Sequence, residues 1–354
     1  MKIFAFYLPQ FHEIPENNEW WGKGFTEWTN VKKAQQLCRN QIQPKVPLNN
    51  NYYNLLDVET VQWQTQLMDK YRVDGLIYYH YYFEGRKLLE KPAENLLKNK
   101  NINQKFFFCW ANHSWNRAWK GSREVLLEQT YGDESAWEEH FQYLLPFFKD
   151  ARYEKKNNKP LFMIFRPDFK EKNDIVDYFN KRCIDEGFNG IHIFETCYAI
   201  HGEGYRAFRD NLNPISNVFF RQSWLGEHLI RKYKIYSRIR AKLAKMGLGS
   251  YIFTMSGDKC LKASMQYKSE FSDATPGLFF EWDNTPRHGK RGYIITPVTH
   301  PVFEKYMNHF RNSEYMFVNA WNEWCEGMIL EPTEENGYKY LEWIKKWKEE
   351  QERG

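Results

Sequence analysis

Two glutamates, Glu323 and Glu326, lie three positions apart in a stretch that also holds Trp321 and Trp324. On a helical turn, side chains with this spacing lie on one side, about 5–6 Å apart. A pair of carboxylates at about this separation is what cleavage of a glycosidic bond with retention of configuration requires. We therefore predict Glu323 and Glu326 as the catalytic pair of a carbohydrate-active enzyme. The alternative is a solvated loop pair bound to an arginine.

The two acids follow an apolar run at residues 315–318, which is typical of a buried strand that ends where it meets solvent. The eight predicted strands comprise residues 3–8, 75–82, 106–111, 160–165, 190–196, 216–220, 277–282 and 315–320. Because these runs are continuously apolar, they favour a parallel sheet that is covered on both faces. The predicted helices comprise residues 55–71, 93–99, 135–148, 173–186, 227–246, 301–312 and 338–350. Asp133 is expected to cap the third of these helices.

This alternation of strands and helices predicts an α/β fold, a single (β/α)8 TIM-type barrel with elaborated βα loops, as one domain over residues 1–354. A doubly wound open sheet is the alternative, but no G-x-G-x-x-G or P-loop motif follows any strand. In a TIM-type barrel, the catalytic side chains lie on the loops at the carboxyl ends of the strands.

Polar and aromatic side chains cluster after most of the predicted strands, as expected of a saccharide site. The chain holds 14 Trp, 23 Tyr and 27 Phe, together 18% of its residues. Sugars stack their flat C–H faces on such rings, while their hydroxyl groups need fixed polar partners. Many of the rings must instead form an aromatic core. The candidate substrate-binding residues are Tyr7, Gln10, His12, Trp28, Tyr79, His80, Trp110, Asn112, His113, Arg117, Arg166, Glu195, Trp282, Asp283, Arg287, Trp321, Asn322 and Glu331.

Three histidines of this set, His12, His80 and His113, have spacings that fit no standard metal-ligand motif. We therefore expect them to bind sugar hydroxyls rather than zinc, and we predict no metal and no other cofactor. The six cysteines are dispersed without a C-x-x-C pair, which favours reduced and packed thiols.

Arg117 and Arg287 leave two interpretations open. They either hold a phosphate or carboxylate of the substrate, or they form salt bridges with Asp168, with Asp283 or with the catalytic pair. Glu331, which precedes a proline, is expected to orient other groups or to contact a sugar hydroxyl rather than to act as a third catalyst.

The net charge of +5 is concentrated in one segment, because residues 231–245 carry seven cations and no anion. This predicted helix is either solvated or a peripheral contact with anionic lipid at the inner membrane. Nucleic-acid binding is disfavoured, since the rest of the chain is not basic. The first apolar run is too short for a secretory signal, and no run is long enough to span a membrane, so a cytoplasmic location is expected. The sequence predicts no particular oligomeric state.

The chain resembles the WbsX-type proteins, often labelled glycosyltransferases of surface-polysaccharide clusters, which carry a domain similar to glycoside hydrolase family 99. The resemblance extends over nearly the whole chain in consistent order. It is carried by residues 4–12 (FAFYLPQFH), 21–30 (WGKGFTEWTN), 78–82 (YYHYY), 108–112 (FCWAN), 282–287 (WDNTPR) and 319–327 (NAWNEWCEG), with Glu331 and Pro332.

The resemblance implies a retaining enzyme on a (β/α)8 barrel, similar to the family's α-mannosidases and α-mannanases, that needs no metal. Glu323 then matches the residue that removes the proton of the sugar 2-hydroxyl, which attacks C1 to form a 1,2-anhydro sugar. Glu326 matches the general acid that protonates the leaving oxygen and later activates water. The implied substrate is an α-mannoside-like linkage in a bacterial O-antigen or capsule oligosaccharide, which is cleaved or transferred.

The segment after the third predicted strand departs from the family pattern, with His113 and Ser114 in place of a Glu-Asn pair and Lys120 in place of an Asp. The resemblance therefore leaves the sugar open. One alternative is a glycosyltransferase of polysaccharide biosynthesis, although the chain has neither a D-x-D motif nor a Rossmann-type phosphate loop. A non-catalytic carbohydrate-binding protein is the other.

Overall fold

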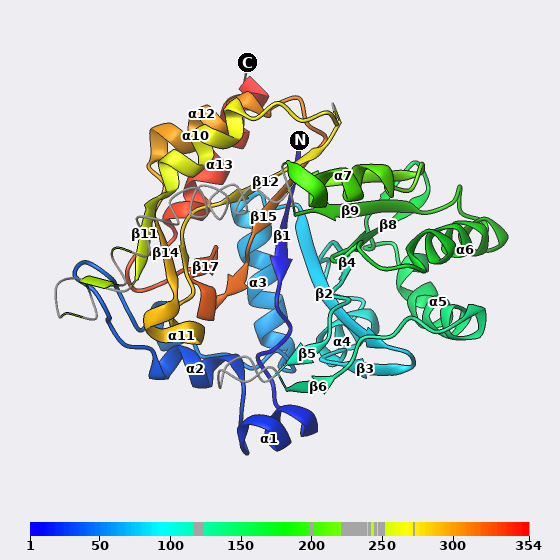
Figure 1. The fold of residues 1–354 in the computed structure, drawn as a ribbon, viewed down its shortest axis with the longest axis horizontal. Helices are drawn as coiled ribbons and strands as arrows, with labels where there is room; N and C mark the ends of the chain where they lie inside the picture. Colours follow the sequence, from blue (N-terminus) through cyan, green and yellow to red (C-terminus); the bar gives the residue numbers. More distant parts are fainter. Residues whose placement is uncertain are drawn as a thin grey trace.

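The computed structural model describes residues 1–116, 124–198, 201–220, 252–271 and 273–353, and the single positions 239, 242, 243 and 246. Eight parallel strands form a closed barrel (Figure 1). In neighbour order they are β1 (Lys2–Tyr7), β15 (Tyr315–Asn319), β12 (Thr275–Phe279), β10 (Ser216–Phe220), β9 (His192–Cys197), β8 (Lys159–Ile164), β4 (Phe106–Trp110) and β2 (Gly75–Phe83). Strand β1 pairs with both β15 and β2, which closes the barrel. The predicted (β/α)8 fold is confirmed.

Aromatic rings fill the inside of the barrel. Phe107 of β4 packs against Phe317 of β15, with ring centroids 5.6 Å apart, although these two strands are not neighbours. Phe194 and Phe219 also contact Phe317, at 5.1 and 5.2 Å. Helices cover the outer face of the same strands (Figure 1). Burial on both faces explains why the strands appear in the sequence as continuous apolar runs.

The helices around the barrel are α3 (Val58–Tyr71), α4 (Lys91–Lys98), α5 (Glu134–Lys149), α6 (Lys172–Asp185), α7 (Gly202–Asp210), α10 (Gly257–Gln266), α12 (His300–His309) and α13 (Lys339–Arg353). Helix α5 begins where the sequence predicts it, because the Asp133 side chain accepts hydrogen bonds from the backbone N–H groups of Ser135 and Ala136. Helices α7 and α10 were not predicted. Apart from the single positions 239, 242, 243 and 246, the predicted helix 227–246, with the basic segment 231–245, lies outside the described residues.

Short elements elaborate the ends of the strands. After β1 come α1 (Pro15–Trp21), α2 (Glu27–Lys33) and η1 (Leu48–Asn50). The additions to β2, β4 and β8 are β3 (Arg86–Leu88), β5 (Trp115–Asn116), β6 (Val125–Leu127) and β7 (Lys155–Lys156). A small sheet contains β11 (Phe253–Ser256), β13 (Trp282–Asp283) and β14 (Tyr293–Thr296), with α11 (Thr285–His288) and η3 (Gly289–Arg291) between the last two. After β15 come β16 (Asn322–Glu323), η4 (Trp324–Glu326) and β17 (Met328–Ile329).

Within the described ranges, none of the helices combines the length and the apolar character that crossing a membrane requires.

Candidate functional site

The hairpin that follows β15 carries both candidate acids. Glu323 ends β16, Glu326 ends the 3-10 turn η4, and the chain returns in β17. Asn322 ties the hairpin to the end of β1, because its side chain accepts a hydrogen bond from Leu8 N at 2.7 Å and donates one to the Leu8 carbonyl at 3.0 Å. Gly327 has a φ of 64°, and an added Cβ would lie 3.1 Å from the backbone of β13. The turn after Glu326 therefore requires glycine.

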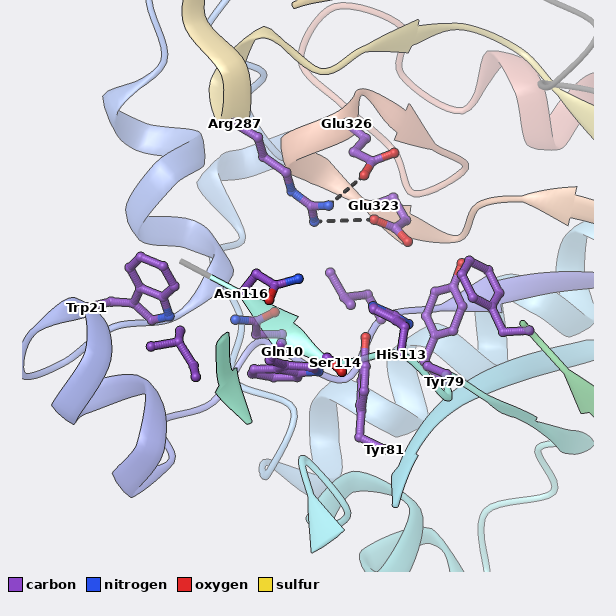
Figure 2. A pocket seen from close by; sticks show the side chains of 15 residues that line it. Gln10, Trp21, Tyr79, Tyr81, His113, Ser114, Asn116, Arg287, Glu323 and Glu326 are labelled. Carbon is purple, nitrogen blue, oxygen red and sulfur yellow. Dashed lines mark hydrogen bonds and ion pairs between the residues drawn. The ribbon is translucent and has the colours of Figure 1, made fainter. Parts of the chain in front are cut away.

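Both acids bind the same guanidinium (Figure 2). Arg287 Nη1 lies 2.5 Å from Glu326 Oε1, and Arg287 Nη2 lies 3.4 Å from Glu323 Oε2. Arg287 Nη2 also lies 2.8 Å from Oε1 of Glu27, a fully buried residue at the start of α2. Glu326 receives a further hydrogen bond, at 3.2 Å, from the indole of Trp282. One arginine of α11 thus joins three carboxylates from two loops of the barrel.

The charges around Arg287 decide its protonation state. Burial lowers the pKa of the guanidinium, but the charges of Glu27, Glu326 and Glu323 more than offset this effect and raise the pKa well above its usual value. Arg287 is therefore a fixed cation between the two candidate catalytic acids. Asp283, which the sequence left open as a partner of Arg287, instead accepts hydrogen bonds from Gln41 at 2.8 Å and from Gln43 at 2.9 Å.

A cavity of about 310 Å³ opens beside these acids at the carboxyl ends of the strands (Figure 2). Aromatic rings and small polar groups surround it. Its lining residues are Leu8, Gln10, Trp21, Tyr79, Tyr81, Ala111, His113, Ser114, Trp115, Asn116, Leu126, Phe165, Arg287, Glu323 and Glu326. Of the sequence-predicted residues, Gln10, Tyr79, His113 and Arg287 therefore share this cavity with the acid pair.

The alternation of side chains along β2 separates two of the predicted residues. Tyr79 and Tyr81 line the cavity, whereas His80 and Tyr82 point to the opposite face of the strand, as a strand requires of successive residues. His80 Nε2 lies 2.9 Å from Nε2 of His140 in α5. Burial, and then the charge of Lys87, lower the pKa of His80 to about 3. His80 is thus a neutral residue of the outer layer and does not line the cavity.

Glu331 lies in a closed cage of hydrogen-bond donors. Its Oε1 accepts bonds from Trp321 Nε1 at 2.9 Å and Gln64 Nε2 at 2.7 Å. Its Oε2 accepts bonds from Trp324 Nε1 and the Tyr53 hydroxyl, both at 2.8 Å. Burial raises the pKa of Glu331 to about 7, although these four bonds act in the opposite direction. Glu331 is 2% exposed, so it orients Trp321 and Trp324 and does not reach the cavity.

Several other predicted residues lie outside the cavity lining. Trp28 packs on Trp324 with ring centroids 5.2 Å apart. The hydroxyl of Tyr7 donates to Gln64, one of the donors to Glu331. His12 is buried, with 1% of its surface exposed.

The remaining predicted residues lie farther from the acids. Glu195 forms a buried ion pair with Lys172 at 2.6 Å. The indole of Trp110 donates to the Tyr82 carbonyl and its ring packs on His140, in the outer layer. The side chain of Asn112 binds the backbone N–H and carbonyl of Arg166, and Arg166 lines a separate cavity. Arg117 lies outside the described residues.

Sequence reasoning missed several lining residues. Tyr81 was predictable, because it lies two positions from Tyr79 and therefore on the same face of β2. Trp115 packs edge-on against Tyr81, at 5.2 Å, and follows the polar cluster after β4. Glu27 does not line the cavity, but its ion pair with Arg287 was also missed. The sequence around Glu27 does not indicate this pairing, because it depends on how α2 packs against the last hairpin. Across the described residues, we find no group of three or more His, Cys, Asp or Glu side chains arranged to hold a metal ion.

Comparisons with known proteins agree on the family and the fold. The family model described as Glycosyltransferase WbsX matches residues 3–344. The chain belongs to the WbsX family. The protein WxcX from two strains of Xanthomonas campestris pv. campestris is 28% identical over 360 residues. That match covers 96% of this chain and 48% of WxcX, so the chain spans about half the length of the curated relatives it matches.

Solved glycoside hydrolase structures share the fold of this WbsX-family chain. The GH99 endo-alpha-mannosidase from Bacteroides thetaiotaomicron superposes with a TM-score of 0.53 at 13% identity, covering 99% of this chain and 97% of the mannosidase. A glycoside hydrolase-like protein superposes with a TM-score of 0.59 at 13% identity, covering 98% and 93% of the two chains. At this level of identity the similarity shows the architecture of the barrel.

Proposed function

We propose that this chain is a retaining carbohydrate-active enzyme, a single catalytic barrel with Glu323 and Glu326 as its catalytic residues. It cleaves or transfers an α-mannoside-like linkage in an oligosaccharide of a bacterial surface polysaccharide. One observation carries the proposal: two carboxylates meet one guanidinium at the wall of an aromatic cavity. Membership of the WbsX family and the glycoside hydrolase fold support the same class of chemistry.

In the first half of the proposed reaction, the Glu323 carboxylate takes the proton of the sugar 2-hydroxyl, and the 2-oxygen attacks C1. Glu326, entering as the neutral acid, gives its proton to the glycosidic oxygen as the bond from C1 to that oxygen breaks. The products are a 1,2-anhydro sugar and the released alcohol.

In the second half, Glu326 takes a proton from a water molecule, and the water oxygen attacks C1. The bond between C1 and the 2-oxygen breaks, and Glu323 returns its proton to the 2-oxygen. Two inversions at C1 give net retention. A sugar hydroxyl in place of water would give transfer through the same two residues, which accommodates the glycosyltransferase name of the family.

Arg287 suits this sequence because one negative charge passes between the two acids. Glu323 carries the charge before the first half, and Glu326 carries it afterwards. A guanidinium that contacts both carboxylates stays next to the charge in either state, so no counter-charge has to move. Tyr79, Tyr81 and Trp115 supply aromatic faces for the sugar ring.

The test determines by proton NMR which anomer of the product forms first. The protein is incubated with aryl α- and β-mannosides and with α-linked manno-oligosaccharides. We expect the α-anomer to form first from an α-linked substrate, and we expect Glu323→Gln and Glu326→Gln to bind saccharide without turnover. A β-anomer formed first would refute the retaining mechanism. Saccharide binding without turnover in the unmodified protein would favour a carbohydrate-binding role instead.

A further inference from the structure

A second cavity, of about 670 Å³, is lined by a residue that directly follows a lining residue of the catalytic cavity. Phe165 follows β8 and its ring lines the catalytic cavity, while the next residue, Arg166, lines the second cavity. Phe169, Tyr198 and Phe208 contribute aromatic surface to the second cavity. Two consecutive residues after β8 thus line two different cavities.

Arg166 is held firmly at this boundary. The side chain of Asn112 accepts a hydrogen bond from Arg166 N and donates one to the Arg166 carbonyl, both at 2.7 Å. The guanidinium lies over the ring of Tyr198, 4.3 Å from its centroid. The hydroxyl of Tyr198 in turn donates to the Phe165 carbonyl. The position of the cation is therefore fixed by the protein before any ligand binds.

Within the described residues, no carboxylate neutralises the charge of Arg166. Its guanidinium makes no ion pair with any carboxylate in the described part of the chain, in contrast to Arg287 with its three partners. Lys170 and Asp168 also line the cavity, whereas Lys172 is already paired with Glu195. The cavity wall therefore carries a positive excess that is centred on a guanidinium stacked on an aromatic ring.

The charge of Arg166 also reaches the catalytic cavity. The loss of water around the His113 ring, and then the charge of Arg166, lower the pKa of His113 to about 4. His113 lines the catalytic cavity and its ring lies 5.7 Å from that of Phe165. The Arg166 guanidinium lies 5.8 Å from the centroid of the Phe165 ring. A ligand that extends from the catalytic cavity past Phe165 would therefore meet Arg166.

We propose that Arg166 binds an anionic group, a carboxylate or a phosphate, on the saccharide that the catalytic cavity holds. The inference rests on the proposed function and narrows its substrate class to acidic saccharides. A guanidinium presents paired N–H donors in one plane, which match the oxygens of a carboxylate or a phosphate. Phe169, Tyr198 and Phe208 provide surfaces for the sugar ring that carries the anion.

The test is a binding measurement with ligands that contain no glycosidic bond, so its outcome does not depend on turnover. Calorimetric titrations compare mannose, mannuronate and mannose 6-phosphate on the unmodified protein and on Arg166→Met, Arg166→Lys and Arg206→Met. Arg206 is an exposed arginine of α7 outside the cavity lining and serves as the matched control.

We expect at least one acidic sugar to bind tenfold or more tightly than mannose. The preference should vanish in Arg166→Met, persist in part in Arg166→Lys and stay unchanged in Arg206→Met. Selective binding of mannuronate would assign a uronate, and selective binding of mannose 6-phosphate would assign a phosphate ester. Equal affinity for all three sugars, or an unchanged preference in Arg166→Met, would overturn the inference and leave the catalytic proposal standing.

Discussion

Glu331 lies just beyond the hairpin that carries Glu323 and Glu326, yet its surroundings differ in kind from those of the pair. Four neutral donors enclose Glu331, two on each oxygen, and the residue is 2% exposed. Glu323 and Glu326 are held by a cation and face a cavity. A carboxylate whose lone pairs are all occupied has no capacity left for a substrate, whereas the pair can exchange protons at an open surface.

The contrast shows how the two regions depend on each other. The cage fixes the indoles of Trp321 and Trp324, and Glu323 lies between these two residues in the chain. Glu331 is therefore a positioning residue for the reaction proposed here. The acid pair remains free to react because the adjacent carboxylate takes up the structural role.

The sharpest test of this comparison sets Glu331→Gln against Glu326→Gln. We expect Glu326→Gln to lower turnover by about 10²–10⁴-fold, the range for loss of a general acid, with little change in stability. Glu331→Gln should destabilise the fold by about 1–3 kcal/mol, because the new amide NH2 faces two N–H or O–H donors. Turnover at saturating substrate and chemical denaturation measure the two effects.

Glu342→Gln, at an exposed position of α13, controls for the loss of one negative charge and should change neither quantity. If Glu331→Gln also loses turnover, recovery of that turnover on cooling would trace the loss to destabilisation of the fold around the acid pair. A variant at position 331 with full stability but the turnover defect of Glu326→Gln would contradict the division of roles.

The pH dependence of stability sharpens the comparison, because two sets of buried groups act in opposite directions. The pKa of Glu331 is raised to about 7, so its contribution is full below its usual pKa near 4.5 and is lost as pH rises through 7. The pKa values of His80 and His140 are lowered by burial, so their contribution is full above 6.5 and is lost as pH falls. Each group contributes roughly 1.4 kcal/mol per pH unit within its window.

Chemical denaturation at pH 4.5, 5.5, 6.5 and 7.5 separates these effects by variant. The combined substitution His80→Gln and His140→Gln should flatten the loss of stability on the acid side. Glu331→Gln should flatten the loss between pH 4.5 and 7. Parallel pH profiles for the unmodified protein and both variants would show that these groups do not titrate as their burial requires.

The barrel could be predicted from the sequence because each of its strands is buried on two faces. Such strands leave continuous apolar runs, as at residues 106–111 and 315–320. A local hydrogen bond made the start of α5 predictable through Asp133. Helix α10 was missed although Ser256 caps it. Its glycine, lysines and serine weaken the periodic apolar pattern by which a helix is predicted from sequence.

The acid pair could be proposed from its local spacing, but its partners could not. Arg287 and Glu27 are 260 positions apart, and only the packing of α2 and α11 against the last hairpin brings them together. The cage around Glu331 likewise needs Tyr53 and Gln64 from distant segments. Strand alternation alone would have excluded His80 once Tyr79 was assigned to the cavity.

The most direct test of Glu326 as the proton donor is the dependence of turnover on the leaving group. Turnover of the unmodified protein and of Glu326→Gln is measured on aryl glycosides whose phenols range from strongly acidic dinitrophenol to phenol itself. We expect the variant to lose most of its rate on the phenyl glycoside and far less on the dinitrophenyl glycoside, which departs without a proton. An equal loss on every leaving group, or no loss at all, would contradict the assignment of Glu326 as the catalytic acid.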